Sequence, residues 1–448
     1  MPMPLNVLTQ ALLKAAKTAG ADAADAMAVQ GTSVSIDVRA GALEHAERSE
    51  GVDLGLRVFV GQKVANVSAS DTSDRTIEEM AVRAVAMAQE APEDPYAGLA
   101  DPDQLTQTRN ADGLELYDPT PEPTAEALQD DAMRAEAAAL AVKGVTQAQG
   151  ATAAYGARDV YLAASNGFEG GYSRTDRAIS CVAIAGSGTQ MERDYSGDSR
   201  IFQGDLRSAQ DIGTEAGMRV LERMDARQPK TGTYTVLFDE RISASLIGHM
   251  LAAANGAAVA RGATWLRDAL GEDLLPKGLD VIEDPHRKRA GGSRPFDAEG
   301  LPTKVRKIID NGTLTGWTLD LANARKLDMQ STGNAARGPS SGPSPATWNV
   351  ALTQGDASRA DLIREMGTGL LVTSMIGSTI NPNTGDYSRG AAGLWIENGE
   401  ITYAVNECTI AGNLRDMLRS IVPANDARPH LSRVVPSLLV PGMTLAGS

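Results

Sequence analysis

The sequence predicts an α+β fold in two parts. Residues 1–227 are expected to form an N-terminal domain of helices and antiparallel meanders, and residues 228–448 a mostly antiparallel β domain with a few helices. Three observations support this prediction. Apolar residues at helical spacing alternate with stretches of alternating polarity, short β-like runs are separated by glycines or Asn-Gly pairs, and both patterns stop at Gln228-Pro229-Lys230-Thr231-Gly232.

The first elements are a helix, a meander and a second helix. Leucines and alanines at helical spacing predict a helix over residues 5–19, which Gly20 ends. Residues 27–70 alternate in polarity and predict an antiparallel meander. Its strands are expected to be separated by Gly41, Gly51 and Gly61. Thr76 and Glu79 have the spacing of a capping box that begins the second helix.

The same order returns after residues 91–123, a segment rich in proline, aspartate and glycine that we interpret as a linker or surface excursion. A helix is predicted over residues 124–143, short strands over 151–201 with a hairpin at Asn166-Gly167, and a helix over 205–223. Two interpretations stay open. Either the chain contains a duplicated unit, or one α+β domain carries two incidental hairpin layers.

The second domain opens with a predicted strand at residues 234–238 and a predicted helix at residues 240–254. Asp239 can cap this helix, and Asn255-Gly256 closes it. Farther on, Asn-Gly pairs predict two β-hairpins, at Asn311-Gly312 and Asn398-Gly399.

Two glycine-rich segments of this domain, residues 331–345 and 377–393, stand out from the predicted strands. Long loops in compact domains are often functional, and glycines allow a ligand to approach the backbone closely. Both segments are therefore candidates for contact with a ligand.

Composition excludes several classes of function. Acidic residues outnumber basic ones by 57 to 42, and the net charge of −15 argues against a protein that holds nucleic-acid phosphates. Two cysteines are too few for a disulfide-stapled secreted fold or a zinc finger. No run of about 18 apolar residues predicts a membrane span, and no signal-peptide pattern is visible. We therefore expect a cytoplasmic protein without nucleic-acid or membrane partners.

Few side chains offer catalytic chemistry. The four histidines form no H-E-x-x-H motif, and no nucleotide-binding glycine loop is present. His249, on the predicted helix, is either a ligand or base at the mouth of a cleft or a helix-face side chain bonded to backbone or solvent, and we favour the second interpretation. Cys408 is expected to be a buried small hydrophobe, and the basic run at residues 286–289 a solvated loop.

Several sequence blocks in the C-terminal half together resemble a known family. The blocks, in order, are Ser245–Leu251, Asn255-Gly256, Arg261–Leu266, Asp310–Leu314, Thr332–Ala335, Asn381–Gly393, Trp395–Glu400 and Thr409–Leu414. On these residues the chain resembles the TldD/PmbA family, and within it the PmbA (TldE) branch. The N-terminal half fits in order and pattern, so the resemblance extends over nearly the whole chain.

The resemblance implies a cytoplasmic, heteromeric zinc metallopeptidase built from two related subunits. In this family the TldD-type subunit carries H-E-x-x-x-H on the helix that matches residues 240–254, and a cysteine near the C-terminus completes the zinc site. In this chain the motif falls at about Ile247, Gly248 and Ala252. The Ile and Ala at the two histidine positions offer no lone pair to a metal, and Gly stands at the position of the Glu base. The resemblance therefore implies no catalytic residue and no metal ligand here, with zinc in the TldD-type partner.

The function implied is that of a non-catalytic subunit, which shapes a channel for unfolded or small peptides and supports the zinc-bearing partner. The candidate channel residues are His249, Asn255, Asn334, Asn381, Asn383, Gly385 and Arg389. A homodimer of the isolated chain is also possible on this view. The alternatives are a regulatory peptide- or protein-binding factor of the gyrase-modulator type, without proteolysis, and an autonomous peptidase that uses His249 or an unrecognised site.

Overall fold

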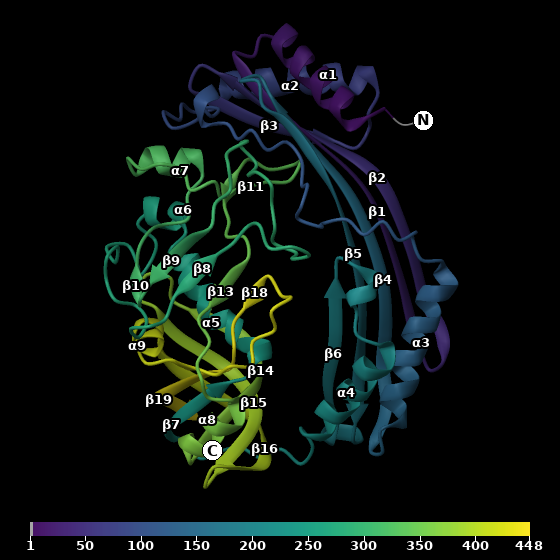
Figure 1. The fold of residues 1–448 in the computed structure, drawn as a ribbon, viewed down its shortest axis with the longest axis vertical. Coiled ribbons are helices and arrows are strands. Elements are labelled where there is room, and N and C mark those ends of the chain that lie inside the picture. The colour runs from purple at the N-terminus through teal and green to yellow at the C-terminus, as the bar shows by residue number, and fades with distance from the viewer. Residues whose placement is uncertain (1–2) are drawn as a thin grey trace.

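A computed structural model describes residues 3–448 and has an α+β architecture in which a long curved sheet lies beside a second, more compact half (Figure 1). The curved sheet belongs to the N-terminal half and is antiparallel throughout, with strand order β3-β2-β1-β4-β5-β6. Its strands are β1 (Ala23–Arg39), β2 (Ala42–Val60), β3 (Lys63–Ala69), β4 (Val145–Ala164), β5 (Glu169–Ala185) and β6 (Glu192–Arg200). Its helices are α1 (Leu5–Ala19), α2 (Asp74–Glu90), α3 (Ala125–Ala141) and α4 (Ala209–Leu221).

The predicted repetition of elements is present. The order α1-β1-β2-β3-α2 is followed by α3-β4-β5-β6-α4, and the strand order of the sheet is symmetric about the antiparallel pair β1–β4. The two sets of three strands form one continuous sheet, so the repeats are joined edge to edge and do not stack as two layers.

The strands are longer than the glycine pattern predicted, and one helix begins earlier. Gly51 was expected to end a strand but lies inside β2, where it pairs with Gly31. The glycines that do sit in turns, Gly41 and Gly61, have positive φ angles of 72° and 59°, which chain reversal requires and side chains resist. The capping box at Thr76 was also wrong: Ser73 caps α2 and its hydroxyl accepts the Thr76 N–H at 3.3 Å.

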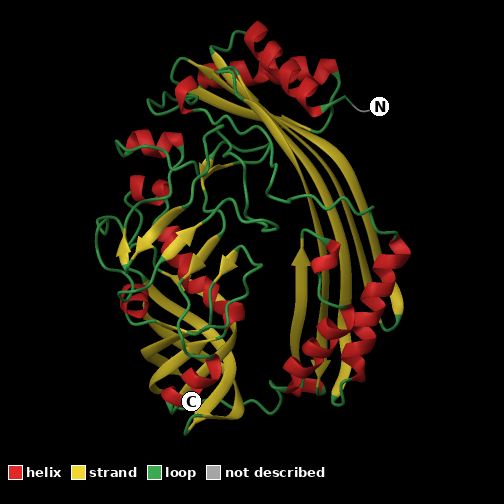
Figure 2. Ribbon diagram, in the orientation of Figure 1, coloured by secondary structure: helices red, strands yellow, loops and turns green. Residues whose placement is uncertain are grey.

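The two faces of the curved sheet have different neighbours. Alternate residues of β1, among them Ala26 and Ile36, are buried under the helices, with α1 and α2 at one end and α3 and α4 at the other. The residues between them, such as Asp25 and Met27, point to the opposite face because successive side chains of a strand alternate. This second face meets loops of the C-terminal half (Figure 2).

The C-terminal half is built on a mixed sheet of order β16-β15-β14-β7-β19-β17, in which β16 also pairs with β19 so that five strands close on themselves. These strands are β7 (Gly232–Phe238), β14 (Gly369–Ile380), β15 (Asp386–Glu397), β16 (Glu400–Asn413), β17 (Val422–Pro423) and β19 (Leu438–Ala446). The smaller sheet has the order β10-β9-β8-β13-β18, with β8 (Val281–Glu283), β9 (Arg306–Asp310), β10 (Thr313–Leu314), β13 (Val350–Leu352) and β18 (Arg433–Val434). Two pairs, β7–β14 and β13–β18, are parallel.

The helices of this half are α5 (Glu240–Ala253), α6 (Gly256–Ala260), α7 (Leu321–Lys326), α8 (Arg359–Met366) and α9 (Leu414–Arg419). The predicted cap at Asp239 is confirmed, since its carboxylate accepts the Arg241 N–H at 3.1 Å. Both Asn-Gly hairpins are confirmed, as β9–β10 and β15–β16. Asn255 also begins α6, because its side chain accepts the Ala257 N–H at 2.9 Å.

The predicted loop at residues 331–345 contains a short strand pair, β11 (Ala335–Ala336) and β12 (Ser344–Pro345), and reaches the N-terminal sheet. A Cβ atom on Gly55 of β2 would lie 2.2 Å from the carbonyl oxygen of Pro339. Only glycine allows the loop and the strand to approach so closely. None of the helices in residues 3–448 is long and apolar enough to cross a membrane.

Candidate functional site

Helix α5 is the element on which the family resemblance places metal chemistry. Its buried face, including Leu246, Ile247 and Met250, belongs to the main core of the C-terminal half. Gly248 and Ala252 lie outside that core, and a Cβ on Gly248 would meet no heavy atom within 4 Å. The base position, Gly248, and one ligand position, Ala252, therefore face available space, whereas the other ligand position, Ile247, is fully buried.

Three side chains from α5 and β15 meet beside this helix. The ring of His249 lies edge-to-face against Tyr387, with 6.0 Å between ring centroids, and the charge of Arg389 acts on both. Tyr387 donates its hydroxyl hydrogen to the sulfur of Met375 at 3.2 Å. The His249 Nε2 and the Arg389 Nε are both buried without a hydrogen-bond partner among the described residues.

Burial dominates the electrostatics of this cluster. It lowers the pKa of His249, and the Arg389 charge lowers it further, so the imidazole stays neutral at neutral pH. Burial raises the pKa of Tyr387 to about 12, against the opposing effect of Arg389. The cluster therefore presents a neutral imidazole, a neutral phenol and one cation.

This arrangement does not fit a zinc ion. Zinc sites use three or four nitrogen, sulfur or carboxylate donors, and no group of three such side chains occurs within residues 3–448. His249 faces a cation instead of a second donor. Cys408, on β16, is buried as expected and donates its thiol hydrogen to the Ala391 carbonyl at 3.2 Å, and burial raises its pKa to about 11.

The candidates Asn381, Asn383 and Gly385 lie together in the turn between β14 and β15. The side-chain oxygen of Asn381 accepts the Asn383 N–H at 3.0 Å, and Gly385 has a φ of 78° that the turn requires. The turn is held from outside, since the Trp265 N–H donates to the Pro382 carbonyl at 2.7 Å. Both asparagines are exposed, so this turn forms a rim near the end of the strand that carries Arg389.

The other two candidates have structural contacts elsewhere. Asn255 caps α6 and donates from its amide to the Pro345 carbonyl at 2.8 Å. Asn334 is buried and donates to Glu283 at 3.0 Å and to the Ala346 carbonyl at 2.8 Å. The structure thus brings together His249 with Arg389 and, separately, the three residues of the turn.

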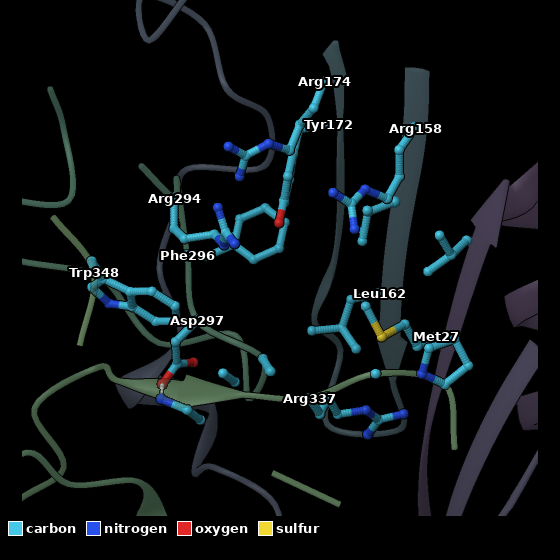
Figure 3. Close-up of a pocket in the computed structure, with 17 residues that line it drawn as sticks. Met27, Arg158, Leu162, Tyr172, Arg174, Arg294, Phe296, Asp297, Arg337 and Trp348 are labelled. Carbon is cyan, nitrogen blue, oxygen red and sulfur yellow. Dashed lines mark hydrogen bonds between the residues drawn. The ribbon is translucent and has the colours of Figure 1, made fainter. Parts of the chain in front are cut away.

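Sequence reasoning missed a second site, a cavity of about 200 Å³ between the curved sheet and loops of the C-terminal half (Figure 3). Four arginines line it: Arg158 and Arg174 from β4 and β5, and Arg294 and Arg337 from the loops. Apolar and aromatic side chains line the rest, including Met27, Leu162, Tyr172, Phe296 and Trp348. The sequences of β4 and β5 do not single out these arginines, because their pairing depends on the strand register.

The basic run at residues 286–289 is a solvated loop, as expected, and its exposed side chains also connect the two halves of the molecule. Arg289 pairs with Glu115 at 2.7 Å and with Asp205 at 3.1 Å, while Lys288 pairs with Glu115 at 2.9 Å. The carboxylates come from segments of the N-terminal half. The sequence did not predict these ion pairs, because the acidic partners are more than 80 residues away.

Comparisons with known proteins cover the whole chain. The family model described as PmbA/TldA metallopeptidase C-terminal domain matches residues 231–447, and the models for domain 1 and the central domain match residues 24–88 and 118–224. Metalloprotease PmbA of Escherichia coli O157:H7 is 36% identical over 447 residues, which cover 99% of this chain and 96% of that protein.

Two solved structures have the same overall fold as this chain. A Bacteroides thetaiotaomicron protein named as a candidate modulator of DNA gyrase is 27% identical and has a TM-score of 0.91, covering 99% of both chains. TldE from Thermococcus kodakarensis is 19% identical with a TM-score of 0.83, covering 98% of this chain and 100% of that one. The second likeness shows the fold alone.

Proposed function

The chain belongs to the PmbA/TldD metallopeptidase family, and we propose that within it the chain is the non-catalytic subunit of a two-subunit, cytoplasmic zinc peptidase. In this proposal a TldD-type partner holds the zinc and cleaves unfolded or small peptides. This chain supports that partner and shapes the peptide channel. No step of the cleavage is assigned to its own side chains.

The observation that carries the proposal is the state of α5. The helix keeps its cap at Asp239 and its buried face, so the scaffold for the family's chemistry is intact. The positions that match the ligands carry Ile247, Gly248 and Ala252, and the neighbouring imidazole faces Arg389. A cation beside the only histidine of the helix opposes a second positive charge there.

A peptide channel is supported by the groups near α5 that lack partners. Arg389 and His249 each have a buried nitrogen without a hydrogen bond among residues 3–448, and such groups are costly unless something bonds to them. An extended peptide exposes one carbonyl and one N–H per residue. The exposed turn with Asn381, Asn383 and Gly385 is proposed as the rim, and Asn255 and Asn334 as residues that hold the surrounding loops.

The test starts with metal analysis of the isolated protein and continues with the partner. We expect no stoichiometric zinc, a stable complex with a TldD-type subunit, and cleavage of an unfolded peptide by the complex that exceeds cleavage by the partner alone. Stoichiometric zinc in the isolated chain, or full activity of the partner without any complex, would overturn the proposal. Size-exclusion chromatography of each sample also reports whether the isolated chain forms a homodimer.

Variants then separate a channel role from a scaffold role. Arg389→Gln is expected to lower peptide cleavage by the complex about tenfold while complex formation is unchanged, since a hydrogen bond to a charged group contributes about 1.5–3 kcal/mol. Arg83→Gln is the matched control, because Arg83 is exposed on α2, in the N-terminal half. Equal peptide cleavage by complexes with the two variants would show that Arg389 does not take part in peptide binding in the channel.

One relative carries a name that favours a second function. The Bacteroides thetaiotaomicron protein of 27% identity is named for DNA gyrase, and the net charge of −15 permits binding to a basic protein surface. A pulldown that retrieves gyrase subunits without any TldD-type subunit would favour this regulatory role over the peptidase complex.

A further inference from the structure

The cavity between the curved sheet and the C-terminal loops concentrates positive charge in an acidic protein. Its lining contains four arginines and one carboxylate, Asp297, while the whole chain has a net charge of −15. Asp297 is already occupied: its oxygens accept the backbone N–H groups of Glu299, Leu301 and Ala335 at 2.9–3.0 Å. Arg337 is occupied too, because it pairs with Asp25.

The other three arginines have no acidic partner. Among residues 3–448, Arg158, Arg174 and Arg294 form no ion pair, that is, no carboxylate oxygen lies within 4.0 Å of their guanidinium nitrogens. We call these three residues the unpaired arginine cluster. Arg174 is only 9% exposed and donates to the backbone carbonyls of Gly291 and Ser293. An arginine has five N–H donors, so donors remain available for a ligand.

The sheet itself brings two of these charges together. Arg158 of β4 and Arg174 of β5 are directly paired in the strand register, and directly opposite residues project from the same face. Side chains in such pairs have Cβ atoms about 4.5–5.5 Å apart, and like charges there are destabilising. A bound anion would remove this repulsion.

One end of the cavity carries the unpaired arginines, and the other is lined by apolar side chains and by Arg337, which Asp25 neutralises. Along β4 the residues Arg158, Val160 and Leu162 share one face, and Met27 of β1 is the register partner of Leu162. Figure 3 shows the side chains of Arg158, Arg174 and Arg294 toward one end of the cavity and Leu162 and Met27 toward the other, where Arg337, paired with Asp25, also lies. A ligand that fills this space must be anionic at one end and apolar at the other.

The loop side completes both parts of the cavity. The guanidinium of Arg294 lies over the ring of Trp348, 5.5 Å from its centroid, which holds the arginine in place. Phe296 packs edge-to-face on Tyr172 with 5.8 Å between centroids and extends the apolar wall. The volume of about 200 Å³ is below the roughly 300–1,000 Å³ of pockets for drug-sized ligands. It suits a single amino-acid residue.

We propose that this cavity binds the C-terminal residue of a peptide, with the carboxylate on the unpaired arginine cluster and an apolar side chain against Met27, Leu162 and Phe296. Arginine suits this task because its planar fork donates two parallel hydrogen bonds to a carboxylate. The choice of a peptide as the source of the carboxylate rests on the proposed function. The anionic and apolar halves of the site rest on the cavity alone.

Isothermal titration calorimetry on the isolated full-length protein tests the proposal without the partner subunit. The probes are N-acetyl-Phe-Leu with a free carboxylate, the same dipeptide as its C-terminal amide, and inorganic phosphate. The free acid is expected to bind at least about tenfold more tightly than the amide, because the amide cannot form the charge-assisted pairs. Equal binding of acid and amide, or no binding of the acid, overturns the proposal.

Phosphate distinguishes the second source of an anion. If inorganic phosphate binds as tightly as the free acid and displaces it, the site recognises anions without regard to the apolar part, and the peptide assignment fails. The expected result is that phosphate binds at least about tenfold more weakly, because it makes no contact with the apolar wall.

Variants locate the binding. Arg158→Gln is expected to weaken binding of the free acid about tenfold or more and to leave binding of the amide unchanged. The fold should tolerate the change, because Arg158 is exposed and has no protein partner among residues 3–448. Arg83→Gln on α2 serves as the matched control. If both variants bind the free acid as tightly as the wild type does, the proposed site is wrong. If the free acid does not bind but the complex with the TldD-type subunit still cleaves peptide, only the cavity proposal is refuted. If the free acid binds but no such complex forms, only the subunit proposal is refuted.

Discussion

Two groups of arginines line the same face of the curved sheet, and they differ in what neutralises them. Arg57 and Arg337 share the carboxylate of Asp25, with Arg57 Nε donating at 2.8 Å, and we call these three residues the paired cluster. The unpaired arginine cluster, Arg158, Arg174 and Arg294, has only backbone or aromatic contacts.

Burial sharpens the difference. The side chains of the paired cluster are 8% exposed or less. Burial opposes ionisation of Asp25, but the charges of Arg337 and Arg57 outweigh it and hold the pKa of the carboxyl below its usual range. Because Arg337 comes from a C-terminal loop and Asp25 from β1, the paired cluster joins the two halves of the molecule. An arginine group at this interface that has its own counter-charge joins the two halves, while a group left without counter-charges is available to a ligand.

The largest expected effect comes from breaking the paired cluster. Asp25→Asn leaves the buried Arg337 without its carboxylate and Arg57 with only Glu299 at 4.0 Å. Removal of one partner from a buried ion pair costs about 3–5 kcal/mol of unfolding free energy. Urea denaturation measures the change. Asp268→Asn is the control, since Asp268 is exposed and makes no ion pair within residues 3–448. A loss below about 1 kcal/mol for Asp25→Asn would mean that this cluster does not hold the interface.

A steric change at the same interface should cost less. The Cβ of Gly55→Ala would lie 2.2 Å from the Pro339 carbonyl oxygen, so the loop must move, and overpacking of this kind costs about 1–3 kcal/mol. Gly51→Ala lies on the same strand with no heavy atom within 4 Å and should be neutral or slightly stabilising. Equal stability of the two variants in urea would show that the loop yields easily.

Glu299, a carboxyl beside the paired cluster, predicts a dependence of stability on pH. Burial and the neighbouring Asp297 raise the pKa of Glu299, which lies 4.0 Å from Arg57, to about 8. The folded state therefore holds a proton that the unfolded state, with its usual pKa of 4.5, releases. Stability is full below pH 4.5 for this group and falls as pH rises toward about 8.

Glu299→Gln tests this dependence, because it removes the titrating group and keeps an acceptor for the Leu321 N–H. The wild type should lose at least about 1 kcal/mol relative to the variant between pH 5 and pH 8, since one pKa unit corresponds to about 1.4 kcal/mol. Thermal unfolding at several pH values measures the difference. Parallel pH profiles for the two proteins would contradict the raised pKa.

The smallest effect on stability is expected in the unpaired cluster. Arg158→Gln removes a like charge opposite Arg174 and should raise the unfolding free energy by about 0.2–1 kcal/mol. The same substitution is the one expected to weaken binding of a free carboxylate. A clear decrease in unfolding free energy for Arg158→Gln would mean that Arg158 stabilises the fold as the paired arginines do, and the two groups would then not differ.

The elements that local patterns predicted are those with local causes. The helix at residues 5–19, the cap at Asp239 and the turns at Asn311-Gly312 and Asn398-Gly399 depend on residues within a few positions of each other, and all are present. Gly51 misled because a glycine inside a strand has the same identity as a glycine in a turn, and only its pairing with Gly31 distinguishes them.

The candidate site divided in the same way. The positions on α5 could be found by resemblance, because they lie on one helix with a fixed spacing. The contact of His249 with Tyr387 and Arg389 joins segments about 140 residues apart, and no sequence pattern within either segment predicts it.

The amino-acid sequence alone is sufficient for the order of elements, the acidic net charge, the residues at the three motif positions of α5 and the hairpin at Asn166-Gly167. The tertiary structure decided the register of that hairpin. Asn-Gly is typical of a two-residue loop, but the Ala164 N–H donates to the Phe168 carbonyl at 2.9 Å, which leaves a three-residue loop. A shift of one residue would turn every side chain of β5 to the other face. The loop therefore places Arg174 beside Arg158, and hydrogen bonds between distant segments complete the cavity around them.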